Sequence, residues 1–151
     1  MAVENITYQD IIEDFEAACT AHYQINSFDN GTIDYLDASA VNRLYPFIYM
    51  RPLSAVLADR TRTLTFELYS LDQPKIGSSS NLSVVSDTEM YIYDLMAWFN
   101  FGPASRQQVY DVVLTSAAPV NEAFQDRVYG WVATIDVITP FNLDYCNYPQ
   151  P

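Results

Sequence analysis

A predicted helix that is apolar around nearly its whole circumference constrains the fold of this 151-residue chain more than any other feature. Ser86 and Glu89 form a capping-box pair, the signature of a helix start, ahead of residues 90–100. One side carries Ile92, Leu95, Met96 and Phe99, the other carries Met90, Tyr93, Ala97 and Phe101, and Tyr91 and Trp98 lie between. Such a helix is normally buried on more than one side. We expect the second side to pack against another subunit; the alternative is that the strands and the C-terminal tail enclose it.

The first helix along the chain is predicted over residues 7–22, and it is amphipathic rather than apolar all round. Thr7 and Asp10 form its capping box, and apolar residues then recur at helical spacing. The opposite side of this helix is acidic, with Asp10, Glu13, Asp14 and Glu16. We expect one half of this helix to face the core and the other half to form an acidic surface.

Alternating polar and apolar residues predict strands between and after the helices. Residues 63–69 alternate most regularly and predict a half-buried strand. Residues 23–28 and 32–36 predict a hairpin joined by a turn at Asp29-Asn30-Gly31. Prolines at 46 and 52 bound an extended segment at 45–50, which suggests an edge or inserted strand. The last two strands are predicted at 109–114 and 127–139, bridged by residues 119–125.

The remaining segments are predicted to be irregular. Residues 70–82 contain Pro74, Gly77 and three consecutive serines, and we expect a mobile loop that becomes ordered on assembly. A short irregular extension is predicted from about residue 140. With no domain linker or repeat, the whole chain, 1–151, is expected to be one domain. The predicted class is α+β, a mostly antiparallel sheet with two main helices packed on one face.

The charge of the chain restricts its partners. With 19 acidic and 7 basic residues the net charge is −12, which opposes tight binding to nucleic acid or to an anionic membrane. No apolar run approaches the ~20 residues that cross a bilayer, so we expect a soluble protein with no membrane partner. Cys19 and Cys146 are the only cysteines, and without a secretory signal at the start they are expected to be free thiols in a reducing cytoplasm.

The charges are also unevenly distributed along the chain. The first 37 residues hold eight carboxylates and no Lys or Arg, whereas the next 25 hold four arginines and one acid, Asp59. Arginine suits planar, bidentate pairing with carboxylates. We therefore expect the acidic region of one subunit to meet the arginine region of its neighbour, through Arg43, Arg51, Arg60 and Arg62.

No catalytic, cofactor-binding or metal-binding set is expected. His22 is the only histidine and continues the apolar side of the first helix, which favours a structural role over a general base. Cys146 could be a nucleophile only if His22 lies beside it. Asp29, Asn30 and Asp34 lack the rest of an EF-hand pattern, and no residues have zinc-ligand spacing. The four glycines are too dispersed to cradle a phosphate.

Residues 5–145 resemble the tail-completion and neck proteins of tailed bacteriophages, and more narrowly their tail-terminator ring proteins. The sequence also resembles virion proteins of crAss-like phages. The resemblance rests on the order of elements, on Tyr45-Pro46, and on a run leading into the final strand: Pro119, Val120, Asn121, Glu122, Asp126, Val128, Gly130 and Trp131. The extension after Pro140 departs from the family pattern and leaves open whether the virion has a long or a short tail.

The resemblance implies an α+β fold and a non-enzymatic, homo-oligomeric ring, a hexamer or dodecamer, that joins portal or neck to tail around a DNA channel. It implies a location in the virion after assembly in the host bacterial cytoplasm. We expect Met90, Tyr93 and Phe101, with the four arginines, at the subunit interface, and the acidic side of the first helix in a lumen that DNA passes without sticking. An acidic DNA-mimicking inhibitor and a small hydrolase that uses His22 are the alternatives.

Overall fold

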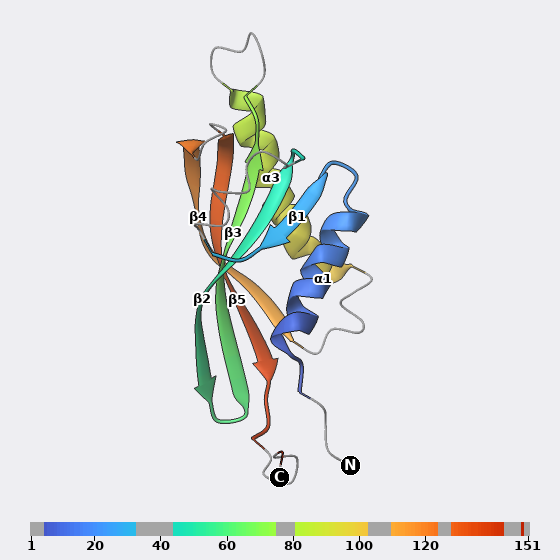
Figure 1. Cartoon of the computed structure of the whole chain (residues 1–151), viewed down its shortest axis with the longest axis vertical. Coiled ribbons are helices and arrows are strands. Elements are labelled where there is room, and N and C mark those ends of the chain that lie inside the picture. The colour runs from blue at the N-terminus through green and yellow to red at the C-terminus, as the bar shows by residue number, and fades with distance from the viewer. Residues whose placement is uncertain are drawn as a thin grey trace.

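The structure is a computed structural model that describes residues 5–32, 44–74, 81–102, 110–123, 128–143 and 149 (Figure 1). Within these residues two helices accompany a five-stranded, mostly antiparallel sheet, which confirms the predicted α+β class. The elements are α1 (Tyr8–Ala21), β1 (Ser27–Asn30), β2 (Phe47–Ala58), β3 (Thr61–Asp72), α3 (Leu82–Phe101), β4 (Asp111–Ala123) and β5 (Val128–Pro140).

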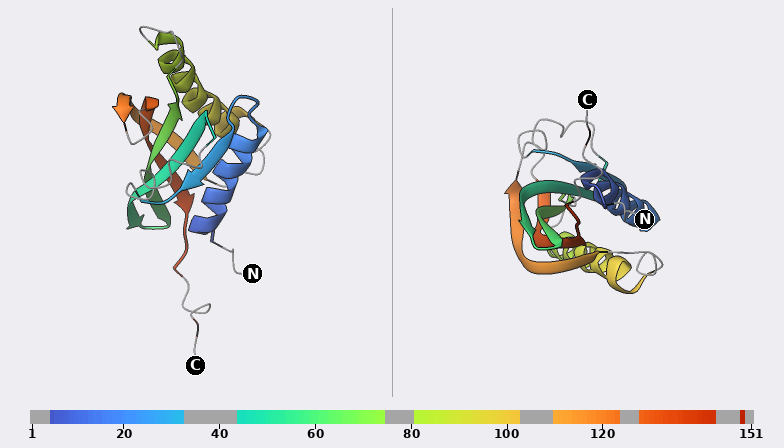
Figure 2. Two further views of the ribbon diagram at one scale, coloured as in Figure 1. Left: turned by 45° about the horizontal axis from the view of Figure 1, so that its top comes forward. Right: turned by 90° about the horizontal axis from the view of Figure 1, so that it is seen from below.

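The strands are arranged in the order β1-β2-β3-β5-β4, so that β3 and β5 are central. Strand β1 pairs with β2 in parallel, and every other neighbouring pair is antiparallel. The sheet is long and strongly curved, and both helices lie on the same side of it (Figure 2). Helix α3 crosses β3, β5 and β4, whereas α1 lies beside β1.

Helix α1 begins where the capping signal predicts. The Asp10 amide donates to Thr7 Oγ1 at 3.1 Å, and the Thr7 amide donates to Asp10 Oδ2 at 2.9 Å. The hydrogen bond from the Thr7 amide lowers the pKa of the Asp10 carboxyl. The apolar side of this helix is buried through Ile11, Ile12, Phe15, Ala18 and Cys19, as its spacing predicts.

The core lies between the sheet and the two helices. Alternate residues of the central strands enter it, among them Phe66 of β3 and Ile135 of β5, because successive side chains of a strand point to opposite faces. A smaller apolar cluster occupies the other face of the sheet near one end: Phe47, Tyr49, Tyr69, Leu71 and Val128. The first four residues of β2 are therefore buried on both faces.

The predicted hairpin at residues 23–36 is wrong in its first half. Asp29 and Asn30 lie inside β1 rather than in a turn, and this strand pairs with β2 in parallel. A parallel pair needs a long crossover instead of a tight turn. Gly31, with φ 142°, ends the strand, and most of the predicted return strand, residues 33–36, lies outside the described residues.

Two prolines lie within strands that the sequence analysis ends too early. Strand β2 continues through Pro52 to Ala58, with a shift of register between Pro52 and Ser54, and β4 continues through Pro119, where a bridge was expected. Both positions lie on sheet edges, where a missing amide hydrogen costs no ladder bond. Of the two alternatives expected for residues 45–50, the structure shows the inserted strand: residues 47–50 lie between β1 and β3, and only the part of β2 beyond them lies at an edge.

Helix α3 begins earlier than predicted. It starts at Leu82, so Ser86 and Glu89 lie inside the helix and do not form its cap. Asn81 occupies the cap position with φ 50° and makes no capping side-chain hydrogen bond. The added turn buries Val84, which supplies a core contact that a start near Ser86 would lose. The predicted loop at 70–82 is correspondingly shorter, and its centre, residues 75–80, lies outside the described residues.

We predict that Gly130→Ala is strongly destabilising. A Cβ atom at this position of β5 would lie 1.8 Å from the carbonyl oxygen of Ser70 on β3, so the two central strands would have to separate. The expected loss in the free energy of unfolding is about 3 kcal/mol or more, measured by denaturant titration. Ala118→Ser, at an exposed position of β4, also adds one heavy atom and should change stability by less than about 0.5 kcal/mol. Equal effects would contradict the close approach.

Candidate functional site

An exposed apolar stripe runs along the outer side of α3. Met90 is 51% exposed, Tyr93 38% and Phe101 88%, and all three had been expected at an interface. Leu82, Ser86 and Ala97 are also exposed and continue the same side, which spans an arc of roughly 100° at ~3.6 residues per turn. We call these six residues the α3 stripe. The other side of the helix, with Ile92, Leu95 and Phe99, is buried, so the two faces differ as the sequence analysis expects.

The borders of the α3 stripe are fixed by contacts to two different elements. On one border, Asn100 Nδ2 donates to the Met96 carbonyl at 2.8 Å and lies 3.5 Å from the Val112 carbonyl of β4. On the far border, Asp94 Oδ2 lies 2.8 Å from His22 Nε2 at the end of α1. The stripe therefore points away from the sheet, between a border that contacts β4 and a border that contacts the end of α1.

Polar groups hold the aromatic ring at the middle of the stripe. The Tyr93 hydroxyl donates to Glu89 Oε1, one turn earlier, at 2.7 Å, and this hydrogen bond raises the pKa of the tyrosine. The ring is thereby oriented by its own helix while a good part of its surface stays exposed. An apolar stripe with a pre-positioned aromatic side chain is typical of an interaction surface.

The structure places the four expected interface arginines in different settings. Arg51 Nη1 forms an ion pair with Glu67 Oε1 of its own chain at 2.5 Å, and Arg43 lies outside the described residues. Arg62 is also engaged within the chain. Arg60, at the turn between β2 and β3, forms no ion pair with any described residue, so of the three arginines placed here it is the one whose charge is free.

Arg62 fastens the segments before α1 and after β5 to the sheet. Its Nη2 donates to the Ile6 carbonyl at 2.7 Å, and its guanidinium lies 5.0 Å from the centre of the Phe141 ring. Beside it, Asn5 Nδ2 donates to the Asn142 carbonyl at 2.9 Å, and the Asn142 amide donates back to Asn5 Oδ1 at 3.0 Å. Burial lowers the pKa of Arg62. We call this group of contacts the terminal clasp; no spacing in the sequence indicates it.

The four acids expected to line a lumen share the outer side of α1. All four are exposed, but two of them have structural partners. Asp10 caps the helix, and Asp14 Oδ2 accepts the Tyr110 hydroxyl at 2.6 Å, which ties α1 to the residue before β4. Burial and this hydrogen bond raise the pKa of Tyr110. Glu13 accepts from Gln9 of the same helix, so Glu13 and Glu16 are the acids least tied to other elements.

His22 and Cys19 are held in structural roles. The Gln24 amide donates to His22 Nδ1 at 3.1 Å, so the ring proton lies on Nε2 and is donated to Asp94. Both ring nitrogens are therefore engaged, and the imidazole links α1 to α3. Burial raises the pKa of the Cys19 thiol to about 12, so it is protonated near neutral pH. Cys146, the other candidate nucleophile, lies outside the described residues.

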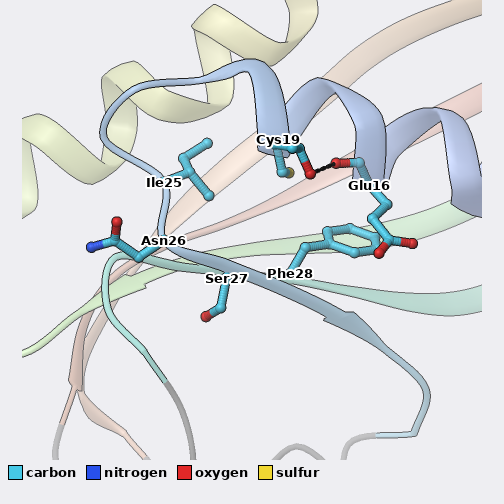
Figure 3. A pocket seen from close by; sticks show the side chains of 7 residues that line it. Glu16, Cys19, Ile25, Asn26, Ser27 and Phe28 are labelled. Atoms are coloured by element: carbon cyan, nitrogen blue, oxygen red, sulfur yellow. Dashed lines mark hydrogen bonds between the residues drawn. The ribbon is translucent and has the colours of Figure 1, made fainter.

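A small hollow lies between α1 and β1 (Figure 3). Its volume is about 90 Å³, well below the ~300 Å³ at which small-molecule pockets begin. Its lining is Glu16, Cys19, Thr20, Ile25, Asn26, Ser27 and Phe28, and the Thr20 hydroxyl donates to the Glu16 carbonyl at 2.9 Å. Another hollow, of about 260 Å³, lies between the turn at Asp59–Arg60 and residues 141–143. Neither gathers an acid, a base and a nucleophile.

Comparisons with known proteins give no match that would help to interpret the α3 stripe. No protein-family model and no curated protein matches this chain. Within the described ranges no three His, Cys, Asp or Glu residues are grouped so as to hold a metal ion. The helices of the same ranges are too short or too polar to span a membrane.

One surface escaped the sequence analysis, the outer edge of β2. Residues 53–58 are all exposed, including Leu53, Val56 and Leu57. The strand predicted from the sequence ends before Pro52, although the six residues that follow Pro52 are uncharged and rich in apolar side chains. That run is the signal that could have found the edge, because most exposed strands carry charges.

We predict opposite outcomes for substitutions on the two sides of α3. Phe99→Ala should cost roughly 3–5 kcal/mol of folding stability, because Phe99 is buried with its ring centre 4.4 Å from that of Phe15. Tyr93→Ala should leave the subunit folded, with near-native circular dichroism, and weaken its self-association. Thermal melts and native mass measure the two effects. If Tyr93→Ala melts the subunit as severely as Phe99→Ala, the stripe belongs to the core and not to an interface.

Proposed function

We propose that this chain is a non-catalytic structural protein that assembles as a homo-oligomeric ring, a hexamer or dodecamer, in the neck or tail of a tailed bacteriophage. In that role it joins the portal or neck to the tail around the DNA channel and resides in the virion. The observation that carries the assembly role is the α3 stripe, a long apolar surface exposed on an isolated subunit. The resemblance of the sequence to tail-terminator proteins supplies the particular setting.

The stripe favours a partner because of its extent. Scattered exposed apolar residues are normal on protein surfaces, but contiguous ones mark interaction sites. Here they follow one side of a 20-residue helix whose opposite side forms the core. A closed ring needs two different surfaces on each subunit that fit one another. The stripe is one such surface, and a second subunit is the partner that a ring provides.

The charge of the chain supports a channel that does not retain DNA. A net charge of −12 repels a polyanion, and Glu13 and Glu16 on the outer side of α1 are exposed and form no ion pair with a described residue. In the proposed ring this side of α1 lines the lumen. DNA then passes with few phosphate contacts, which would otherwise hold it in place.

We predict that the purified protein has a native mass of a hexamer or a dodecamer, because the α3 stripe is covered only in an assembly. Native mass spectrometry of the free protein measures the copy number directly. Mass spectrometry of purified particles should then find the chain in several copies per virion. A chain that stays monomeric at all concentrations would reject the ring, and its absence from particles would reject the virion setting.

A further inference from the structure

Two edges of the sheet are open within the described residues. Strand β1 covers only residues 47–50 of β2, so the outer edge of β2 from Arg51 to Ala58 has no described strand beside it. Strand β4 is the last strand at the other end of the order, and its outer edge is likewise unpaired by any described strand. Each open edge presents backbone amides and carbonyls that no described strand pairs with, and another strand can pair with such groups; the Val112 carbonyl of β4 lies 3.5 Å from Asn100 Nδ2.

Both edges lack the charges that usually protect an exposed strand. Residues 53–58 of β2 and residues 112–120 of β4 contain no Lys, Arg, Asp or Glu. On β4 the first four residues, Asp111–Leu114, form a regular stretch, and a shift of register and Pro119 follow. The regular part of β4 is therefore short and lies at the beginning of the strand.

These two open stretches lie at the same end of the sheet. Val56 of β2 pairs with Thr63, which pairs with Ile138, which pairs with Asp111 at the start of β4. The two edge strands also run in opposite directions, because three antiparallel steps separate them. A copy of the chain placed beside β4 and turned about a ring axis therefore presents its β2 antiparallel to β4, which continues the existing ladder.

We propose that the subunits of the ring are joined by main-chain pairing of Asp111–Leu114 in one copy with Ala55–Ala58 in the next, so that one sheet continues around the assembly. This inference rests on the proposed homo-oligomeric ring and names the contact that closes it. Asp111 lies opposite Ala58, offset by two residues from the level register, and closing a sheet into a ring requires such a stagger.

The register is chosen by the side chains. An offset of two residues leaves each side chain on the same face of the sheet. Residues on one face of the first copy therefore meet residues on the same face of the next copy. Val113, 43% exposed, lies opposite Val56, 59% exposed, on the face away from the helices. Val112, which is already buried in its own subunit, lies opposite Leu57, 52% exposed, on the helix face. The pairing covers apolar side chains on both copies.

The charges at the ends of the two stretches also favour the antiparallel pairing of β4 with the neighbour's β2. Asp111 is exposed at the start of β4 and forms no ion pair with a described residue. In the antiparallel pairing it lies next to the turn of the neighbour, where Arg60 has the free charge. Asp59 shares that turn, and in this register it lies opposite Tyr110. A parallel pairing of the same two stretches would instead place Asp111 opposite Ala55, three positions further from this turn.

The same contact also places the second copy beside the α3 stripe. Helix α3 crosses β4, and one border of the stripe contacts β4 through Asn100, so a subunit added beyond β4 approaches that border. Edge pairing supplies direction and register, while the stripe supplies apolar area. Two surfaces described separately thus belong to one subunit interface.

A charge exchange tests the contact. Arg60→Asp and Asp111→Arg should each raise the concentration at which half of the protein is assembled by roughly tenfold or more at low salt, because each places like charges together. The double variant should restore assembly. Asp accepts the backbone of residue 60, φ 63°, better than most residues. Glu13→Arg, a reversal on α1 away from both edges, is the control and should leave assembly through the edges intact.

A pair of proline variants tests the hydrogen bonds themselves. Of Ala55 and Val56, one directs its amide to β3 and the other directs it to the open edge, because the direction alternates along an antiparallel strand. Ala55→Pro and Val56→Pro should therefore differ. One should unfold at lower denaturant concentration, and the other should keep native stability and lose assembly.

The outcomes separate this contact from the proposed function. A wild-type chain that never assembles would reject the ring itself. A wild-type ring that survives both single charge reversals, or whose assembly the double variant fails to restore, would overturn the edge contact and leave the ring in place. A stable proline variant that still assembles fully would overturn it as well.

Discussion

The packing of α3 against the sheet is the contact on which the rest of the structure depends. Phe99 meets Phe15 of α1 on one side and lies near Tyr110 on the other, with ring centres 4.4 and 6.3 Å apart. One buried side chain thus joins both helices and the start of β4. Because α3 uses one side for this purpose, its other side is left to the surface, and an apolar surface of that length favours association over solvent.

Strand β2 has two roles along its length, burial in the core and an open edge for pairing. Near the start of β2 it is covered on both faces, with Phe47 and Tyr49 buried opposite the helices. Towards the turn at Asp59–Arg60 both faces of β2 open and its outer edge is unpaired by the described strands. The first half of β2 thus contributes to the core, and its second half has the capacity for pairing. A subunit built this way can fold on its own and still present backbone to a neighbour, because the second half of β2 holds no buried residue.

Local signals predict the parts of this fold that depend on neighbours in the sequence. The Thr7 capping box, the alternation around Phe66 and the two sides of α3 all follow from spacing, and the structure confirms them. The parallel pairing of β1 could not be predicted, because it depends on a distant strand and not on Gly31. The strand was predicted to end before Pro52 for a related reason. A proline can lie within a strand where that strand has no partner on the side of its amide, and the sequence does not show which strands are at an edge. The partners of Arg51 and Arg62 are equally non-local, and charge counting alone cannot distinguish a paired arginine from a free one.

The terminal clasp has a consequence for how the chain could be rearranged. Asn5 and Asn142 are hydrogen-bonded in both directions, so the first and last described segments lie side by side at one end of the molecule (Figure 1). Because these two segments are neighbours, joining them would change the order of the elements along the chain without changing their arrangement in space. A short linker between these two segments and a new opening elsewhere would yield a circular permutant with the same sheet.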